Sequence, residues 1–241
     1  MVKEWELEDW EKDILARWNE INLYTLTRGI NRFKGLALTL SEVNERYIKI
    51  AGLDGFIRWT EDTKELSNES LSKEIQKTDN VCMKKALVWS KAVNKSIDAL
   101  SDNEKCVFDG VRDAILEAKK NADIAIVSSA NEKAVLDEWK SHCLLDHVDI
   151  VLTQNVGSKT YCLEKLIHKG YKKENILMIG DAPGDLEAAQ VNGVLFYPIL
   201  VKKEAQSWKQ FKEQGIKMFN ENKYIGNYQL NLIDDFKKNL S

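Results

Sequence analysis

The sequence predicts an α/β protein in which a helical first part is followed by a parallel sheet covered by helices. In the first part, large apolar residues recur at spacings of three and four, which is the period of a helix face. After about residue 105, short apolar runs alternate with amphipathic stretches, as in parallel-sheet proteins. Both prolines, Pro183 and Pro198, lie late in the chain, and a proline-free start suits long helices. We therefore expect an all-helical domain over 1–103 and an α/β domain with a helical tail over 104–241.

The composition excludes several classes of protein. The chain has 241 residues, 44% of them hydrophobic, and a net charge of −3, so it can bury a core and is not disordered as a whole. It has no basic block to bind nucleic acid or an anionic membrane. No apolar run reaches the roughly 18 residues of a membrane span, and the charged start MVKEWELEDWEKD is unlike a secretory signal, which predicts a cytoplasmic location. The four cysteines share no CxxC spacing and are predicted to be reduced and packed.

The first part is predicted to be a helical bundle without strands. Apolar spacing predicts a helix from Trp5 to Ile21, and a second that begins at Ser41 as its N-cap and ends near Gly52. A short stretch with the helical period predicts a helix over 70–76, and a longer stretch predicts another helix over 81–100. The inward side chains of this last helix are expected to be Val81, Val88, Trp89, Val93, Ile97 and Leu100.

Arg28 and Arg32 lie in the segment YTLTRGINRFKGL between the first two predicted helices. Guanidinium groups match the geometry of phosphate and carboxylate, so both arginines are candidates to bind a substrate anion. The alternative is an ordinary interhelical turn whose arginines are solvated.

The second part contains four apolar runs that we interpret as parallel strands: 124–127, 148–152, 176–179 and 194–199. The stretches between and before them are predicted to be helices, near 108–120, 131–141, 159–170 and 184–191. Ligands of such sheets lie beyond the carboxyl ends of the strands.

Polar residues follow the first three of these runs. Ser128 follows the first, Lys159 the second, and Asp181 and Asp185 the third, with Ser129 as the alternative hydroxyl. Two carboxylates suit Mg²⁺, and a hydroxyl and an amine beside a helix N-terminus suit a phosphoryl group. The combination predicts a metal-assisted phosphoryl site. Each residue also has an ordinary explanation. Ser128 would be a helix cap and Lys159 a solvated lysine at a helix start. Asp181 would be a turn residue, and Asp185 an acid favoured by the helix dipole.

The segments IAIVSS with Ser128, GSKTYCLEKL with Lys159, and ILMIGDAPGDLEAAQVNGV with Asp181 and Asp185 occur in this order, 31 and then 22 residues apart. In order and spacing they resemble the core of the haloacid-dehalogenase-like hydrolase superfamily over roughly 105–200. The resemblance implies a Rossmann-like core with a helical cap over the first part. The implied activity is Mg²⁺-dependent hydrolysis of a small phosphorylated metabolite.

The same resemblance implies a role for each residue. Asp181 would ligate Mg²⁺, and Asp185 would support that site directly or through water. Ser128 would donate a hydrogen bond to the phosphoryl oxygens, and Lys159 would neutralise charge on the phosphate.

The nucleophile of the family, an aspartate in a DxDx(T/V) motif that closes the first strand, is not found. The usual interval places it near Asn22, which is an amide, and the helical period through Ile21 leaves no strand there. The segment GLDGF at 52–56 looks like DLDGT with glycine in place of the nucleophile, and we interpret it as coincidence because it follows a helix.

The family's first strand normally lies between the strands that end at Ser128 and Asp181. Its absence is expected to leave two rows of unpaired backbone groups inside the sheet. There are three alternatives: another segment fills the gap, the strands close up, or the sequence is a truncated form whose first strand precedes Met1. We favour the last of these.

The sequence therefore supports a phosphatase-type hydrolase whose catalytic competence is in doubt. The alternative is a non-catalytic relative that binds phosphate, a ligand or a partner. A haloacid dehalogenase is the second alternative, which the acidic pair disfavours because that chemistry generally needs no metal. The three histidines are assigned no role, and the sequence does not specify the substrate or the oligomeric state.

Overall fold

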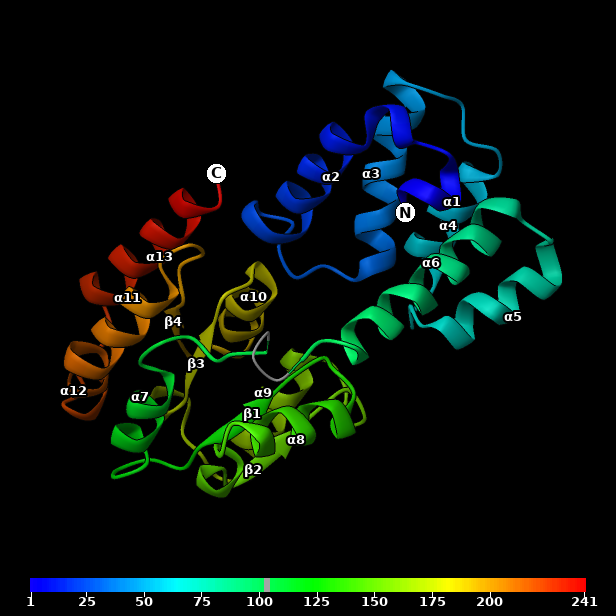
Figure 1. The fold of residues 1–241 in the computed structure, drawn as a ribbon. Helices are drawn as coiled ribbons and strands as arrows, with labels where there is room; N and C mark the ends of the chain where they lie inside the picture. Colours follow the sequence, from blue (N-terminus) through cyan, green and yellow to red (C-terminus); the bar gives the residue numbers. More distant parts are fainter. Residues whose placement is uncertain (102–104) are drawn as a thin grey trace. The chain divides into compact units, whose positions relative to one another are not determined.

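The computed structural model describes residues 1–101 and 105–241 (Figure 1). The chain divides into two compact units, Met1–Lys105 and Cys106–Ser241, called unit 1 and unit 2 below. The predicted domain boundary, between 103 and 104, lies outside the described residues.

Unit 1 is helical, and its described residues contain no strand, as predicted. Two short irregular turns, a 3₁₀ turn at Glu8–Trp10 and a π turn at Glu20–Tyr24, interrupt its first part. The α-helices are α1 (Val2–Trp5), α2 (Glu11–Asn19), α3 (Arg32–Arg46), α4 (Leu53–Asp62), α5 (Asn68–Thr78) and α6 (Val81–Asp98).

The single helix predicted from Trp5 to Ile21 is wrong, because the chain turns at Glu6. This residue has a left-handed conformation with φ of 57°, and its N–H group bonds the carbonyl oxygen of Lys3 to end α1. The turn places Leu7 in the core with no exposed surface. Burial of Leu7 favours the break, and the helical period resumes in α2.

The second helix begins ten residues earlier than predicted. Its N-cap is Asn31, whose Oδ1 accepts a hydrogen bond from the N–H group of Phe33 at 2.9 Å. Ser41, the predicted cap, lies inside α3 and donates its hydroxyl to the carbonyl oxygen of Ala37 at 2.8 Å. Both residue types cap helices, and burial of Phe33 and Leu36 in the core favours the upstream start.

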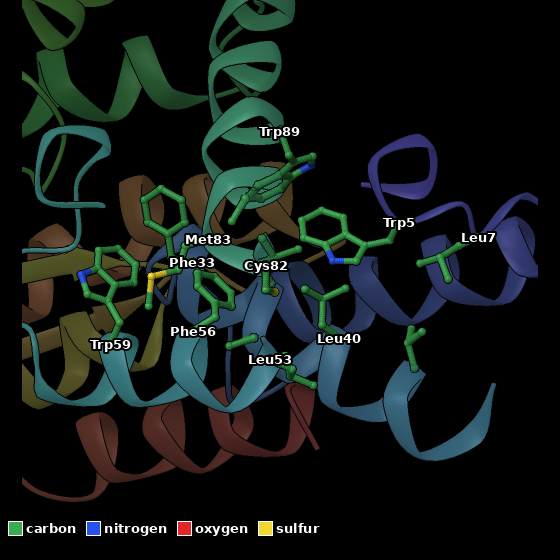
Figure 2. Packing of buried hydrophobic residues seen from close by; sticks show 14 of the residues in the cluster. Trp5, Leu7, Phe33, Leu40, Leu53, Phe56, Trp59, Cys82, Met83 and Trp89 are labelled. Carbon is green, nitrogen blue, oxygen red and sulfur yellow. The ribbon is translucent and has the colours of Figure 1, made fainter. Parts of the chain in front are cut away.

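The predicted bounds of the last helix of unit 1 agree closely with α6, but its predicted inward face is mostly wrong. Val88 is 59% exposed, and three other predicted inward residues are also exposed, namely Val81, Ile97 and Leu100. Trp89 is buried as predicted, together with Cys82 and Met83, which lie on the stripe that faces the other helices (Figure 2). Apolar residues surround much of this helix, so spacing alone did not identify the buried stripe.

Aromatic side chains form much of the core of unit 1 (Figure 2). The ring centroids of Phe33 and Trp59 lie 5.3 Å apart edge to face, and those of Phe56 and Trp59 lie 6.0 Å apart in a stack. Phe56 has no exposed surface. Because Gly52 is the N-cap of α4, the segment GLDGF is a helix start and not a strand end, which supports its interpretation as coincidence.

Unit 2 alternates strands and helices over most of its length, and each of the four predicted strands and four predicted helices is present. These elements are α7 (Val111–Ala118), β1 (Ala125–Val127), α8 (Glu132–Ser141), β2 (Ile150–Leu152), α9 (Lys159–His168), β3 (Leu177–Gly180), α10 (Pro183–Asn192) and β4 (Leu195–Pro198). The predicted helical tail consists of α11 (Glu204–Gln210), a π turn (Phe211–Gly215), α12 (Ile216–Asn220) and α13 (Asn227–Asn239).

The strands are parallel as predicted, but they form two sheets and not one. In one sheet β1 pairs with β2, and in the other β3 pairs with β4. Among the described residues, no strand pairs β1 with β3 or lies hydrogen-bonded between them. The gap that the missing first strand was expected to leave is therefore present, and neither closure of the strands nor another described segment fills it.

The tail packs on β4. Tyr224 is 1% exposed and donates its hydroxyl to the carbonyl oxygen of Phe196 at 2.9 Å, and burial raises its pKa above the ordinary range. Gln229 accepts a hydrogen bond from the N–H group of Phe196 at 2.9 Å. Side chains of the tail thus satisfy both backbone groups of Phe196, on the edge of β4 that faces away from β3.

Only two of the four cysteines pack inside, whereas all four were predicted to do so. Cys82 and Cys162 are buried, and burial raises the pKa of Cys82 to about 11. Cys106 and Cys143 are exposed, so the prediction that all four are packing residues is wrong for this pair.

The helices of the described residues are short or amphipathic. The longest, α6, has 18 residues, and none of them is long and apolar enough to cross a membrane.

Candidate functional site

The loops that follow β1, β2 and β3 are connected at one edge of unit 2. The N–H group of Gln154, after β2, bonds the carbonyl oxygen of Ala130, after β1, at 3.2 Å. Asn155 donates its side-chain amide to the carboxylate of Glu132 at 2.9 Å. Because β1 and β2 are parallel, their carboxyl ends lie at the same edge, and these contacts hold the two loops together.

Lys159 and Asp185 form an ion pair between the starts of α9 and α10. Ser158 caps α9, with its Oγ accepting from the N–H group of Tyr161 at 3.2 Å, so Lys159 is the first residue of that helix. The side chain of Lys159 is 27% exposed and that of Asp185 only 3%. The pair therefore joins the loop after β2 to the loop after β3.

Both carboxylate oxygens of Asp185 are occupied. Oδ1 accepts from Lys159, and Oδ2 accepts from the N–H groups of Asp181 at 3.2 Å and Ala182 at 3.1 Å. Asp185 thus satisfies amides at the N-terminus of α10, where a negative charge is also favoured by the helix dipole. These hydrogen bonds fix the backbone of the acidic loop that contains Asp181 and Ala182.

Gly180 allows Asp185 to lie this close to β3. A Cβ atom on Gly180 would be 2.4 Å from Cγ of Asp185, whereas a Cβ atom on Gly184 would meet nothing within 4 Å. We expect Gly180→Ala to displace Asp185 and to lower the free energy of unfolding by about 1–3 kcal/mol. Gly184→Ala, in the first turn of α10, should leave it unchanged or raise it by up to about 1 kcal/mol.

Urea denaturation of the two glycine variants, followed by circular dichroism, tests this expectation. Equal effects of the two substitutions would show that the close approach at Gly180 has no energetic consequence.

Ser128 directly follows β1 and is half-buried. Its N–H group bonds the carbonyl oxygen of Leu152 at 2.9 Å, and its Oγ accepts from the N–H group of Ala130 at 3.1 Å. A hydroxyl that accepts one hydrogen bond still has its proton to donate. Ser129, the alternative hydroxyl, is exposed, and Asp181 is half-buried directly after Gly180.

Arg28 and Arg32 lie in unit 1 and bond groups of that unit. Arg28 donates to the carbonyl oxygen of Leu23 at 2.6 Å. Arg32 is in the first turn of α3, donates to the carbonyl oxygen of Ser90 at 3.4 Å and to Oδ1 of Asn94, and has a pKa lowered by burial. Arg32 is therefore not the solvated turn residue of the alternative interpretation, and anion binding by either arginine stays a prediction.

The carboxylates of unit 2 suit a metal ion only in part. The described residues contain no group of three or more His, Cys, Asp or Glu side chains that could hold one. Asp181 and Asp185 are adjacent through a backbone hydrogen bond, but Asp185 already binds Lys159 and two amides. Mg²⁺ usually takes one or two carboxylates and keeps several waters, so a site here would need Asp181 as its direct ligand and Asp185 acting through water.

Two residues that the sequence did not single out hold the site together. Gly180 makes room for Asp185, and its only sequence signal is a glycine between an apolar strand and an acidic loop. Asn192 is 8% exposed and donates to the carbonyl oxygens of Thr160 at 3.0 Å and Ala188 at 2.9 Å, which fastens α10 to α9. No sequence pattern marks Asn192.

The fold and the site define an α/β protein with charged loops at the carboxyl ends of parallel strands, where such proteins bind their ligands. A family model described as haloacid dehalogenase-like hydrolase matches residues 55–199, more than half of the chain, and the chain belongs to this family. Neither the curated proteins nor the solved structures gave a match.

Proposed function

We propose that unit 2 binds the phosphoryl group of a small phosphorylated metabolite, as a phosphatase-type member of its family. The observation that carries the proposal is the ion pair of Lys159 and Asp185, which fixes an ammonium group at the starts of α9 and α10. The first-turn amides and the positive ends of the helix dipoles favour an anion at such a position.

Two side chains would contact the phosphoryl oxygens. Lys159 is partly exposed and retains donors besides the one it gives to Asp185. Ser128, directly after β1, would donate its hydroxyl, with Ser129 as the neighbouring alternative. A charge-assisted bond from the ammonium is the stronger of the two contacts.

Mg²⁺ would be held by Asp181, with Asp185 supporting it through water, and would supply charge to polarise the phosphoryl group. Lys159 and the N–H groups of Asp181 and Ala182, which hold the Asp185 carboxylate, would also fix its position relative to the metal ion. An acidic pair at this position favours phosphoryl chemistry over dehalogenation, which generally needs no metal.

Turnover requires an attacking carboxylate, and the DxDx(T/V) motif that would supply it is not in the sequence. Asn22 lies in the π turn of unit 1 and donates to the carbonyl oxygen of Trp18 at 2.8 Å, so it ends no strand. The second candidate function, binding without hydrolysis, is favoured by this observation. We propose that residues 1–241 alone bind phosphate and do not hydrolyse phosphate esters.

Calorimetric titration of the full chain with inorganic phosphate in the presence of Mg²⁺ tests the binding proposal. We expect Lys159→Met and Ser128→Ala each to weaken binding, the first by tenfold or more. Lys165→Met is the matched control, because Lys165 lies on the same helix over the ring of Tyr161 and is exposed. Unchanged binding in both site variants, with their fold retained by circular dichroism, would overturn the proposal.

Release of phosphate from an aryl phosphate distinguishes the two functions. We expect none from the 241-residue chain. Release that survives Asn22→Ala and is lost in Asp181→Ala would show that the chain has a nucleophile elsewhere and is a complete enzyme.

A further inference from the structure

A buried amide connects the end of α10 to the start of α9. Asn192, the last residue of α10, is 8% exposed. Its Nδ2 atom lies 3.0 Å from the carbonyl oxygen of Thr160, the second residue of α9, and 2.9 Å from that of Ala188 on its own helix. An asparagine amide has two N–H groups, so one is available for each carbonyl oxygen. Asn192 therefore uses its whole donor capacity in a bridge between two helices.

Neither carbonyl oxygen needs this amide for a partner. Both lie inside helices, where the N–H group four residues later donates to each carbonyl oxygen. A buried amide costs free energy unless it is hydrogen-bonded, and asparagine is a poorer helix former than alanine or leucine. An apolar residue would fill the same position at lower cost. The contribution specific to Asn192 is therefore a directional bond between the helices.

Packing by itself specifies the register of α9 against α10 only weakly. The two helices are in contact, and the buried side chains of α10 include Ala188 and Ala189. Small side chains form low ridges, and low ridges leave a neighbouring helix several similar grooves. Buried asparagine fixes the register of helices in coiled coils, because a shift leaves its amide without a partner. The same physical effect applies to Asn192.

The start of α9 is attached to α10 at two points. Lys159 pairs with Asp185 in the first turn of α10, and Thr160, the next residue, accepts from Asn192 in the last turn. Asp185 and Asn192 are seven residues apart, or about 10 Å along the helix axis. A shift of α9 by one residue would displace its backbone by about 1.5 Å and rotate it by about 100°. Asn192 thus holds the backbone beside Lys159, while Asp185 holds the ammonium group.

We propose that Asn192 is a positioning residue of the phosphoryl site, which places the ammonium group of Lys159 by fixing the start of α9. Asn192 itself does not contact the anion. Without its amide, α9 is no longer held in one register, and the ammonium is distributed over positions of which only some suit a phosphoryl group. The consequence for binding rests on the proposed function, whereas the placement of Lys159 is a property of the unliganded chain.

Replacement of Asn192 by leucine, and separately by alanine, tests the effect on binding. Both substitutions remove the amide and favour the helix, and alanine also avoids overfilling the position. Calorimetric titration of the full chain with inorganic phosphate and Mg²⁺ should show an affinity about threefold to tenfold lower, which is the usual net contribution of one hydrogen bond.

Gln190→Leu is the matched control for these variants. Gln190 carries an exposed amide on the same helix, so this substitution makes the same chemical change without removing a bond to α9. It should leave the affinity for phosphate unchanged. An affinity in both Asn192 variants equal to that of the unsubstituted chain would overturn the proposal.

A double-mutant cycle with Lys159→Met separates positioning from a general loosening of the fold. If Asn192 acts through Lys159, Asn192→Leu should lower the affinity for phosphate when Lys159 is present and have no further effect in the Lys159→Met background. NMR titration measures these weaker affinities. An equal loss in both backgrounds would show that Asn192 supports binding by another route, which would contradict the proposal.

The ammonium group of Lys159 gives a readout that does not need phosphate. Charge-assisted hydrogen bonds are stronger than neutral ones, so ammonium protons in an ion pair exchange with water slowly enough for ¹H–¹⁵N NMR in the cold. We expect a resonance that Lys159→Met removes. It should persist in Gln190→Leu and broaden or vanish in both Asn192 variants, with their helical circular dichroism unchanged. Absence of this resonance from the unsubstituted chain, or its persistence in both variants, would overturn the proposal.

The two readouts distinguish a failure of this inference from a failure of the proposed function. A chain that binds no phosphate, but whose Lys159 resonance depends on Asn192, would refute phosphate binding and support the positioning of Lys159. A chain that binds phosphate equally well with and without Asn192 would support phosphate binding and refute the inference.

Discussion

Replacing Asp185 by alanine should destabilise unit 2 by about 3 kcal/mol or more. The side chain of Asp185 is 3% exposed, and its carboxylate binds Lys159 and the N–H groups of Asp181 and Ala182. Its removal leaves an ammonium group without its counterion and two amides at the start of α10 without their acceptor. Removal of one partner of a buried pair is costly because the other charge stays in place.

Hydrogen exchange resolved by mass spectrometry measures this effect within the full chain, since it reports on peptides of unit 2 separately. The control is Asp113→Ala, which removes a surface ion pair with Lys212 in the same unit. Solvent and salt screen such a pair, so no resolvable change is expected. If Asp185→Ala changes exchange as little as Asp113→Ala does, the buried pair has no structural role.

Phe56→Ala should lower the free energy of unfolding of unit 1 by about 3–5 kcal/mol. Phe56 has no exposed surface and packs against Phe33 and Trp59, so alanine would leave a cavity among aromatic rings. The matched control is Val88→Ala on α6, a residue that the spacing predicted to face inward but that is 59% exposed. We expect it to change stability by no more than about 0.5 kcal/mol.

Tryptophan fluorescence during urea denaturation measures this pair of variants. Five of the seven tryptophans lie in unit 1, namely Trp5, Trp10, Trp18, Trp59 and Trp89, so the signal reports mainly on that unit. A large loss of stability in Val88→Ala would support the inward face predicted from spacing. It would contradict the packing of Cys82, Met83 and Trp89.

The elements of unit 2 could be predicted well because two periods alternate there. Short apolar runs bounded by polar loops are distinct from amphipathic helices, and each predicted strand lies within about two residues of the observed one. In unit 1 one period continues throughout, so the break at Glu6 and the start of α3 at Asn31 depended on which side chains are buried. Spacing does not contain that information.

The candidate site shows the same division. The order of Ser128, Lys159, Asp181 and Asp185 along the chain was sufficient to predict the family, and the family model agrees. The ion pair of Lys159 with Asp185 joins residues 26 positions apart and depends on the room that Gly180 leaves beside β3. Such a contact exists only once α9 and α10 are packed together.

The sequence by itself determined the helical first part, the parallel strands and the family, because local periodicity and motif order reside in the chain. It also predicted that a strand would be missing between those ending at Ser128 and Asp181. Only the tertiary structure decided that the sheet stays divided around a cavity of about 810 Å³, and that Asp185 is a buried anchor of its loop. Both depend on which distant groups lie within hydrogen-bonding reach, and packing in three dimensions sets those distances.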